Sequence, residues 1–460
     1  MVCAWSLLLA APAAAAPAEI DVPAADLPAA IVALARQTGI SVAGTDRIPH
    51  LRTRRLSGRM EAGAALSLLL AGSGLRAVAA GPGLWRLEPV PPAVAAPRPA
   101  PADIIILATK RAERLDHAPI AISIVRPDSA AAPSGRGAIA ALAGAEGVFA
   151  TNLGPGRDRM FLRGVADSAF NGTTQSTVSL FLDDTRVSYA TPDPDLRLAD
   201  VERVEVLRGP QGTLYGTGAL GGIVRIVTAR PDPDAFAARL MAEGSDVAHG
   251  GAGGGVEAMA NVPLAAGRLG LRVVGWSDTT AGWIDDRGRG ASNVNRVDRY
   301  GGRLALRTYT GDDWTVDAAL TGQRIDARDS QYATSGLARA TALAEPHDNE
   351  FIAASLTVRG RLADLDFLSA TAFVHHDMTS RFDASALPPA GTTGPVAWTE
   401  HRLLGLGTQE WRVSDQAATR PWVTGVSLLF ADNRQHSSFT SAAGETGPDR
   451  RHVNSFEAAA

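Results

Sequence analysis

Ten successive segments in the second half of the chain alternate between apolar and polar residues, and this pattern constrains the fold more than any other feature of the sequence. In residues 314–323, for example, Trp, Val, Ala and Leu alternate with Thr, Asp, Ala and Thr. A period of two places successive side chains on opposite faces of a β-sheet. Turn residues separate the segments, and no helical pattern lies between them. The segments are 236–243, 256–262, 269–277, 300–309, 314–323, 351–359, 364–375, 406–413, 422–431 and 452 to the end.

This alternation is typical of a transmembrane β-barrel, whose strands of about ten residues turn apolar side chains to lipid and polar side chains inward. A soluble β-sandwich would alternate as well, and it remains an alternative on the pattern alone. Trp and Phe near the ends of segments, with Arg and Asp at many alternate positions, favour the barrel. We therefore expect a mainly β protein in which residues 231–460 form the N-terminal part of a membrane-spanning barrel.

The composition of the chain excludes several other classes of protein. The single cysteine, Cys3, rules out intramolecular disulfides, thiolate zinc sites and iron–sulfur ligation. The chain has 44 basic and 48 acidic residues, and Lys110 is its only lysine. Because there is neither a basic footprint nor a polybasic patch, we expect no nucleic-acid partner.

Residues 1–18 have the composition of a secretory signal peptide. The uncharged stretch 2–18 contains Pro12 and Pro17 and ends in a run of alanines. It is too short and too rich in proline to span a membrane, whereas an A-x-A site at its end suits cleavage. A buried helix of the mature fold is the alternative, and export is the working assumption.

Residues 19–88 predict a small α+β domain. Apolar residues recur with helical spacing from Leu27 to Ala35, and Gly39 supplies a stop after the helix. A strand, a second helix and a hairpin are predicted at 40–43, 65–70 and 75–87.

A proline-rich segment and a β-branched run follow this domain. Six of the fourteen residues in 89–102 are proline, which favours an extended linker. Residues 103–109 read Asp-Ile-Ile-Ile-Leu-Ala-Thr and begin a tether that reaches residue 114. Such a run is suited to adding a strand to the sheet of a partner, although an ordinary buried first strand would look the same.

Residues 115–230 form the next predicted unit, with strands at 121–125, 178–182, 201–207 and 223–228. Six of the fifteen residues in 208–222 are Gly, which indicates repeated positive φ angles or close backbone approach. Residues 216–221 match GxGxxG, but a dinucleotide site needs a helix directly after that loop and a strand follows here. No metalloprotease or serine-hydrolase motif is present. We expect no enzyme, and neither a catalytic residue, a metal site nor a cofactor.

Four motifs of this unit carry the most specific signal in the chain. They are FLRG at 161–164, VSLFLDD at 178–184, DVERVEVLRGPQGTLYG at 200–216 and GGIVRIVT at 221–228. Together they closely resemble the plug domain of TonB-dependent outer-membrane receptors, including the family's RGP-x-G-x-LYG motif. The resemblance implies an α+β plug inside an outer-membrane β-barrel, and a signalling domain shared with secretins at 19–88. It also implies that the tether starts with a TonB box, formed by Asp103, Ile104, Ile105, Ile106, Leu107, Ala108 and Thr109.

The same resemblance implies a function and its partners. Such a protein is a receptor and transporter in outer-membrane lipid, most often for a ferric siderophore, and its N-terminal domain lies in the periplasm. TonB of the inner-membrane energy-transducing complex pulls on the box, and an inner-membrane anti-sigma regulator is a further partner of a transcriptional signal transducer. The residues that match family contacts between plug and barrel wall are Arg163, Glu202, Glu205 and Arg208.

Plug loops that face outward meet the ligand in this family. Here the corresponding loop, 188–195, offers Tyr189, Thr191 and Asp193. Tyr189 has a flat apolar face and a hydroxyl, and prolines stiffen the loop, so that less entropy is lost on binding. The alternative, of equal weight, is that Tyr189 packs against the barrel wall.

The length of the chain departs from the family. The family's barrel has about twenty-two strands, whereas ten are predicted here. A plug of about 125 residues has an outer radius near 18 Å, which a ring of about ten strands is too narrow to enclose. We therefore expect that about half of the barrel is absent from these 460 residues. The alternative function is that of a periplasmic interaction or signalling protein without transport, since an incomplete barrel cannot close.

Overall fold

The computed structural model describes two compact units, one within residues 1–102 and one from residue 103 onward. The predicted signal peptide up to Pro17 and the predicted linker from residue 90 to 102 lie outside the described residues. The described residues are 18–44, 51–73, 75–81, 83–89, 105–106, 110, 113–114, 121–126, 137–142, 145–151, 153–165, 175–311, 313–390, 392–415 and 421–459.

The smaller unit combines two helices with two small sheets. The helices are α1 (Leu27–Thr38) and α2 (Ala62–Leu69). In one sheet β1 (Ala18–Val22) pairs antiparallel with β3 (Leu56–Met60). The other sheet has the order β2 (Ser41–Ala43), β5 (Leu84–Pro89), β4 (Leu75–Gly81).

The helix pattern predicted for this unit is confirmed. The buried side chains of α1 are Leu27, Ala30, Ile31 and Leu34, so its apolar face points into the core. After the helix Gly39 has a φ of 68°, and its N–H donates to the carbonyl of Ala35 at 2.9 Å. The second helix and the hairpin also form as predicted. Strands β1 and β3 were not predicted: Leu-Ser-Gly-Arg-Met in β3 carries almost no apolar alternation, whereas the alternation of Ala-Glu-Ile-Asp-Val in β1 was overlooked.

A five-stranded mixed sheet forms the centre of the plug. Its order is β12 (Thr185–Arg186), β11 (Val178–Leu182), β14 (Gly222–Thr228), β13 (Val201–Arg208), β8 (Ile122–Val125). Strands β11 and β14 run parallel, and the other neighbours are antiparallel. The four strands predicted here are therefore confirmed.

Short elements surround this sheet. They are α3 (Ala138–Leu142), α4 (Gly212–Tyr215), the pair β9 (Val148–Ala150) and β10 (Met160–Leu162), and the pair β6 (Ile105–Ile106) and β7 (Glu113–Arg114). In the ranges that the structure describes, no helix is long and apolar enough to cross a membrane.

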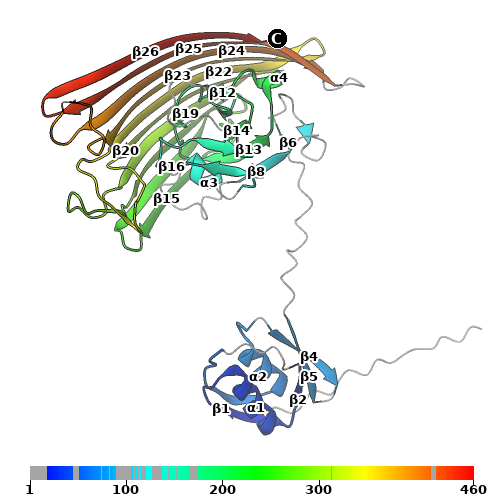
Figure 1. Cartoon of the computed structure of the whole chain (residues 1–460). Coiled ribbons are helices and arrows are strands. Elements are labelled where there is room, and N and C mark those ends of the chain that lie inside the picture. The colour runs from blue at the N-terminus through cyan, green and yellow to red at the C-terminus, as the bar shows by residue number, and fades with distance from the viewer. Residues whose placement is uncertain are drawn as a thin grey trace, which may run out of the picture. The chain divides into compact units, whose positions relative to one another are not determined.

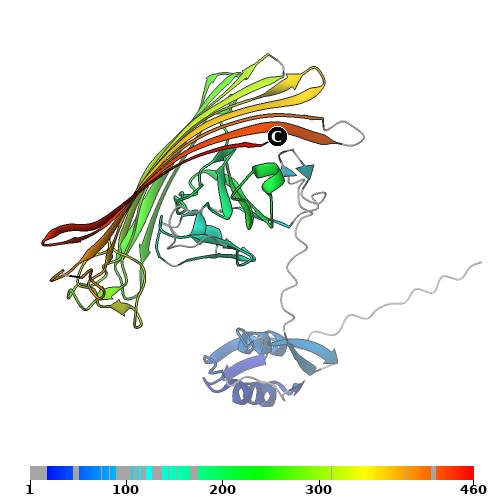
Figure 2. The same cartoon turned by 45° about the horizontal axis from the view of Figure 1, so that its top comes forward.

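The rest of the larger unit is a single antiparallel sheet in which ten strands follow one another in chain order. Figure 1 shows this sheet curving around the plug, and Figure 2 shows the plug on its concave side from a second direction. The strands are β15 (Ala237–Asp246), β16 (Ala252–Ala265), β17 (Leu269–Thr280), β19 (Val297–Thr310), β20 (Trp314–Ala327), β22 (His347–Leu362), β23 (Leu365–Asp383), β24 (Ala397–Asp415), β25 (Trp422–Ser441) and β26 (Gly444–Ala459).

All ten strands predicted from the alternation are present, but several are longer than predicted. Strand β25 has 20 residues, against the ten residues of the predicted segment. Its second half reads Asp-Asn-Arg-Gln-His-Ser-Ser-Phe-Thr-Ser, where polar side chains occupy both faces and the alternation is lost. Backbone pairing continues there without an apolar signal in the sequence.

The two ends of the sheet differ. At one end three of the four connections between strands are turns of two or three residues, 266–268, 311–313 and 363–364, and we call this the short-turn end. At the other end the connections include 281–296 and 328–346, which carry the parallel pair β18 (Asp285–Asp286) and β21 (Ala338–Arg339). We call this the long-loop end.

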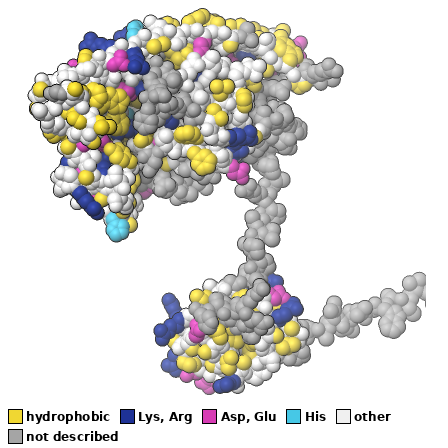
Figure 3. Space-filling model, viewed as in Figure 1, with side chains coloured by type: hydrophobic (Ala, Val, Ile, Leu, Met, Phe, Trp, Pro, Cys, Tyr) yellow, Lys and Arg dark blue, Asp and Glu magenta, His cyan; other side chains and the backbone are white. Residues whose placement is uncertain are grey.

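The faces of the sheet have the predicted polarity. Large apolar side chains such as Leu240, Phe373 and Phe456 are more than 60% exposed on one face. Figure 3 shows hydrophobic side chains over much of the visible surface of this unit. On the other face Thr321, Gln323 and similar polar residues are buried against the plug. The apolar core of the plug continues into this wall through Phe351, Ala353, Val374, Leu404, Leu406, Leu429 and Ala431.

Candidate functional site

Two glycines of the loop between β13 and β14 are packed too tightly for a side chain. Gly218 has a φ of 77°, and a Cβ there would lie 2.8 Å from the carbonyl oxygen of Ser176. Gly222 has a φ of 140°, and a Cβ there would lie 2.1 Å from the carbonyl oxygen of Leu207. The loop contains the single turn α4 and leads directly into β14, as the sequence predicts. It therefore has no following helix whose N-terminus receives a pyrophosphate.

The interface between plug and sheet, which we call the plug–wall interface, contains several buried ion pairs. In the first of these contacts the carboxylate of Asp200 accepts hydrogen bonds from two strands of the wall. Its carboxylate accepts two hydrogen bonds of 2.7 Å from Arg272 of β17 and one of 3.1 Å from Arg303 of β19. The side chains of Asp200 and Arg303 are each 4% exposed. This bidentate, desolvated contact ties the plug to two neighbouring strands of the wall.

A second acceptor, Asp184, lies in the turn between β11 and β12. Arg225 of β14 donates to it at 2.8 Å, and Arg359 of β22 donates to its other oxygen. Burial favours the neutral carboxyl, but the two arginines outweigh it and hold the pKa of Asp184 below its usual range. Arg359 also binds Asp317 of β20, which binds Arg307 of β19, so the contact extends across three strands.

A third contact joins the tether to the wall. Lys110 has a φ of 65°, and its ammonium group forms an ion pair with Glu410 of β24. The ammonium also lies 4.6 Å from the ring centroid of Tyr215, the tyrosine of the LYG motif. The Lys110 side chain is 12% exposed, and burial lowers its pKa. The sequence singled out Lys110 only as the single lysine of the chain. Its position directly after the predicted TonB box is the feature that could have identified it as a site residue.

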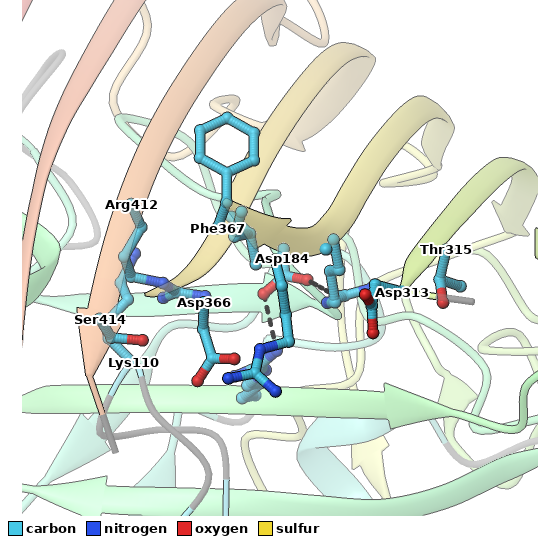
Figure 4. Close-up of a pocket in the computed structure, with 13 residues that line it drawn as sticks. Lys110, Asp184, Asp313, Thr315, Asp366, Phe367, Arg412 and Ser414 are labelled. Atoms are coloured by element: carbon cyan, nitrogen blue, oxygen red, sulfur yellow. Dashed lines mark hydrogen bonds and ion pairs between the residues drawn. The ribbon is translucent and has the colours of Figure 1, made fainter. Parts of the chain in front are cut away.

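A cavity of about 450 Å³ opens beside these last two contacts. Figure 4 shows Asp184 at its centre, with Lys110, Asp366, Arg412 and Ser414 to one side of it and Asp313 and Thr315 to the other. Because its wall residues adjoin the turns 311–313 and 363–364, the cavity lies at the short-turn end. Five cationic and three acidic side chains line it, namely Lys110, Arg225, Arg359, Arg361, Arg412, Asp184, Asp313 and Asp366.

At the long-loop end the plug contacts the wall through different residues. Arg157 donates to the carbonyl of Glu345 at 2.9 Å and stacks on the Phe382 ring at 4.9 Å. Asp195 accepts a hydrogen bond of 2.6 Å from Arg299 of β19. In the connecting loops the fully buried Arg339 is paired with Asp286, Asp329 and Glu345. Among the described residues no group of acidic, His or Cys side chains is arranged to hold a metal ion.

The three residues predicted to meet a ligand are buried, and of these Tyr189 contacts the wall. Tyr189 is 3% exposed, Thr191 1% and Asp193 7%. The Tyr189 hydroxyl donates to Glu457 of β26 at 2.7 Å and accepts from Gln175 at 2.7 Å. This geometry favours the alternative in which Tyr189 packs on the wall, and a ligand contact by these residues stays a prediction.

The residues predicted to hold the plug to the wall have their described contacts inside the plug. Arg203 donates to Glu205 at 2.8 Å and to Glu202, and Arg208 donates to Ser123 of β8. Arg163 is exposed, with a φ of 52°. The described side-chain contacts with the wall come instead from other residues, among them Lys110, Arg157, Gln175, Asp184, Tyr189, Asp195, Arg197, Asp200 and Thr217.

Of the predicted TonB box, only Ile105 and Ile106 fall in the described ranges. They form β6 and pair antiparallel with Arg114 and Glu113 of β7. Asp103, Ile104, Leu107, Ala108 and Thr109 lie outside the described residues.

Comparison with known proteins agrees with this architecture. Residues 114–223 match the family model of the TonB-dependent receptor plug domain. A stretch of 71 residues, 15% of this chain and 10% of the relative, is 46% identical to the pesticin receptor of Yersinia pestis. Residues 114–223 are thus a plug domain of the TonB-dependent receptor type.

Solved structures show the same fold at low sequence identity. The ferric yersiniabactin uptake receptor of Yersinia pestis aligns with a TM-score of 0.56 and 17% identity, over 74% of this chain and 61% of that one. The ferripyoverdine receptor of Pseudomonas aeruginosa aligns with a TM-score of 0.59 and 15% identity, over 96% of this chain and 62% of that one. The chain therefore has the fold of TonB-dependent outer-membrane β-barrel receptors and spans about three fifths of the length of these two.

Proposed function

We propose that the protein is a TonB-dependent outer-membrane receptor and transporter. One observation carries this proposal: a plug domain of the matching type is held by buried charge pairs against the polar face of a sheet whose other face is apolar. An apolar outer face suits lipid, and a polar inner face suits a solute path that the plug obstructs.

The cargo that we propose is a ferric siderophore. Support comes from the relatives, since the two aligned solved structures are a ferric yersiniabactin uptake receptor and a ferripyoverdine receptor. The ligand would arrive at the long-loop end, where Arg157 of the plug lies against Glu345 and Phe382 of the wall. Tyr189, Thr191 and Asp193 are proposed to respond to it, Tyr189 through its contact with Glu457 of the wall.

TonB is the proposed energy-coupling partner, and residues 103–109 are its proposed binding segment. Addition of the segment to a sheet of TonB would use main-chain hydrogen bonds. In the structure the core of the segment, β6, already pairs with β7 over two residues. TonB would therefore either replace β7 or add to the other edge of β6.

We also propose a role in signalling, in addition to transport. The alignment with the ferripyoverdine receptor covers 96% of this chain. Because residues 103–460 make up less than four fifths of the chain, the aligned part includes much of the first unit. We propose that residues 19–88 are a periplasmic signalling domain whose partner is an inner-membrane anti-sigma regulator. Deletion of 19–88 should then abolish ligand-induced transcription and leave uptake intact.

The test of transport uses cells that lack the gene and are complemented with wild-type or variant forms. Uptake of ⁵⁵Fe-labelled siderophores is measured with and without TonB. Ile105→Pro should abolish uptake and leave ligand binding intact, because proline removes a main-chain donor and fixes φ. Ile105→Val keeps both the donor and the β-branched side chain and is the matched control. Uptake at the wild-type rate in the Ile105→Pro strain would contradict the assignment of the box.

A further inference from the structure

Two cavities meet at Lys110 in the plug–wall interface. The first is the cavity of about 450 Å³ at the short-turn end. The second has a volume of about 70 Å³ and is lined by Tyr215 of the plug, by Thr408 and Glu410 of β24, and by Glu457 of β26. Lys110 and Asp184 line both cavities, and the two side chains therefore lie where the cavities adjoin.

Lys110 is fixed in this position from two sides. Its ammonium group is paired with Glu410 of the wall and faces the ring of Tyr215, which packs edge-on against Phe181 at 5.0 Å. A lysine stem of four methylene groups lies along apolar surface while the charged end finds its partners. Lys110 is thus a plug-side residue that both fills space and binds the wall.

Lys110 is also close to the proposed pulling point in the sequence. It is the next described residue after Ile106, four positions along the chain. Four residues reach at most about 14 Å when fully extended, so a longer displacement of β6 must move Lys110. Asp184, in contrast, lies in the turn between β11 and β12 and is held by Arg225 of β14.

Glu410 of the wall retains a cationic neighbour if Lys110 moves away. Arg412 of β24 lies 3.5 Å from the other carboxylate oxygen of Glu410, so this carboxylate keeps a cationic neighbour when the lysine leaves. Loss of one partner from a buried pair is most costly when it leaves an uncompensated charge. Here the remaining charge is compensated, which makes the contact suited to repeated opening.

We propose that Lys110 is the partition between the two cavities, and that tension on the tether withdraws it and joins them into one passage between the plug and strands β23 and β24. Arg225, Arg359 and Arg412 line this passage, so it suits an anionic cargo or one rich in hydrogen-bond acceptors. The role of tension rests on the proposed function, whereas the partition itself rests on the two cavities.

The experiment measures the modification rate of a cysteine probe by an anionic methanethiosulfonate reagent. The probe is Thr408→Cys in a Cys3→Ser background, in the full protein in outer membranes. Lys110→Ala should speed modification by about tenfold or more, because the probe becomes reachable from the first cavity without a separate opening step. Lys110→Arg keeps charge and length and should stay within about twofold of the parent rate. A second probe, Ser437→Cys on the buried face of β25 toward the long-loop end, is the control for general loosening of the plug.

The modification rates at the two probes support or overturn the partition as follows. Acceleration at Thr408→Cys alone supports the partition, whereas unchanged rates with Lys110→Ala, or equal acceleration at both probes, overturn it. With Lys110 in place, energised cells that contain TonB should modify the Thr408→Cys probe faster than cells without TonB. If Lys110→Ala accelerates modification but TonB makes no difference, the partition stands and the proposed energy coupling fails.

Discussion

Replacement of Asp200 by asparagine should separate the plug from the wall more readily than any single substitution at an exposed ion pair. Asparagine has the size of aspartate and tolerates the positive φ of 51° found at this position, so the backbone is preserved. What changes is the charge that faces Arg272 and Arg303.

The expected loss in the free energy of unfolding depends on which hydrogen bonds Arg272 and Arg303 retain in the variant. Arg303 still donates to the main-chain carbonyls of Ala199 at 3.2 Å and Asp200 at 2.8 Å, whereas Arg272 loses its bidentate acceptor. Breaking a buried pair by removing one partner costs about 3–5 kcal/mol, and the retained bonds of Arg303 place this case near 3 kcal/mol. With a urea dependence of about 2 kcal/mol per molar, the midpoint should fall by about 1.5 M.

Trp276 supplies the assay. It is 6% exposed and clusters with Ala199 of the plug and Val274 of the wall, directly beside Asp200. Its emission is obtained as the difference between the purified protein in detergent and the same protein carrying Trp276→Phe. The control is Asp348→Asn, since Asp348 and its partner Arg324 are 52% and 43% exposed and such pairs contribute about 0–1 kcal/mol. A shift for Asp200→Asn no larger than that of the control would refute the reasoning.

Three further predictions use the same urea titration. Burial, reinforced by the nearby Asp195, raises the pKa of Asp193 to about 7, so the folded plug holds a proton that the unfolded chain loses near pH 4. The contribution of Asp193 to stability should therefore be lost as the pH rises from 4 to 7, so the midpoint of Asp193→Asn relative to that of the parent protein should rise over this range; a difference that does not change with pH would contradict the assignment. Gly222→Ala should lower the midpoint sharply, because its Cβ would meet the Leu207 carbonyl, whereas Gly212→Ala, with open space around its Cβ, should have little effect. Tyr189→Phe removes the hydrogen bond donated to Glu457 and the one accepted from Gln175, and should cost about 1–2 kcal/mol with ligand affinity unchanged; a loss of affinity with the plug still folded would restore the ligand role of Tyr189.

The fold could be predicted from the sequence because its signals are local. Period-two alternation identified all ten strands of the sheet, and the glycine-rich loop was correctly expected to lead into a strand. The extent of the strands could not be predicted where both faces are polar, as in the second half of β25. Strand order within the plug, with β14 between β11 and β13, depends on long-range pairing that no local pattern encodes.

The site could be predicted less well, because its contacts join residues distant in the sequence. Lys110 and Glu410 are 300 positions apart, and Asp200 and Arg272 are 72 apart. The residue types were visible, but arginine and aspartate occur at so many alternate positions that no pairing follows from them. Motif matching pointed to Glu202, Glu205 and Arg208, whose described partners lie in the plug, and it missed Asp200 at the start of the same motif.

The charged contacts that lie beside the apolar ones at this interface have a physical reason. Burial of apolar surface gains free energy in proportion to area, so a plug joined to the wall only by apolar side chains would expose that area to water on every opening. A buried ion pair is close to neutral in net stability against a well-packed apolar pair, because desolvation offsets the Coulomb attraction. When the pair opens in water, both charges recover their hydration, and the geometric demands of a bidentate contact such as that of Arg272 with Asp200 restore the register on closing. Buried ion pairs therefore give an interface that is specific when closed and tolerant of water when open, as the proposed movement of the plug requires.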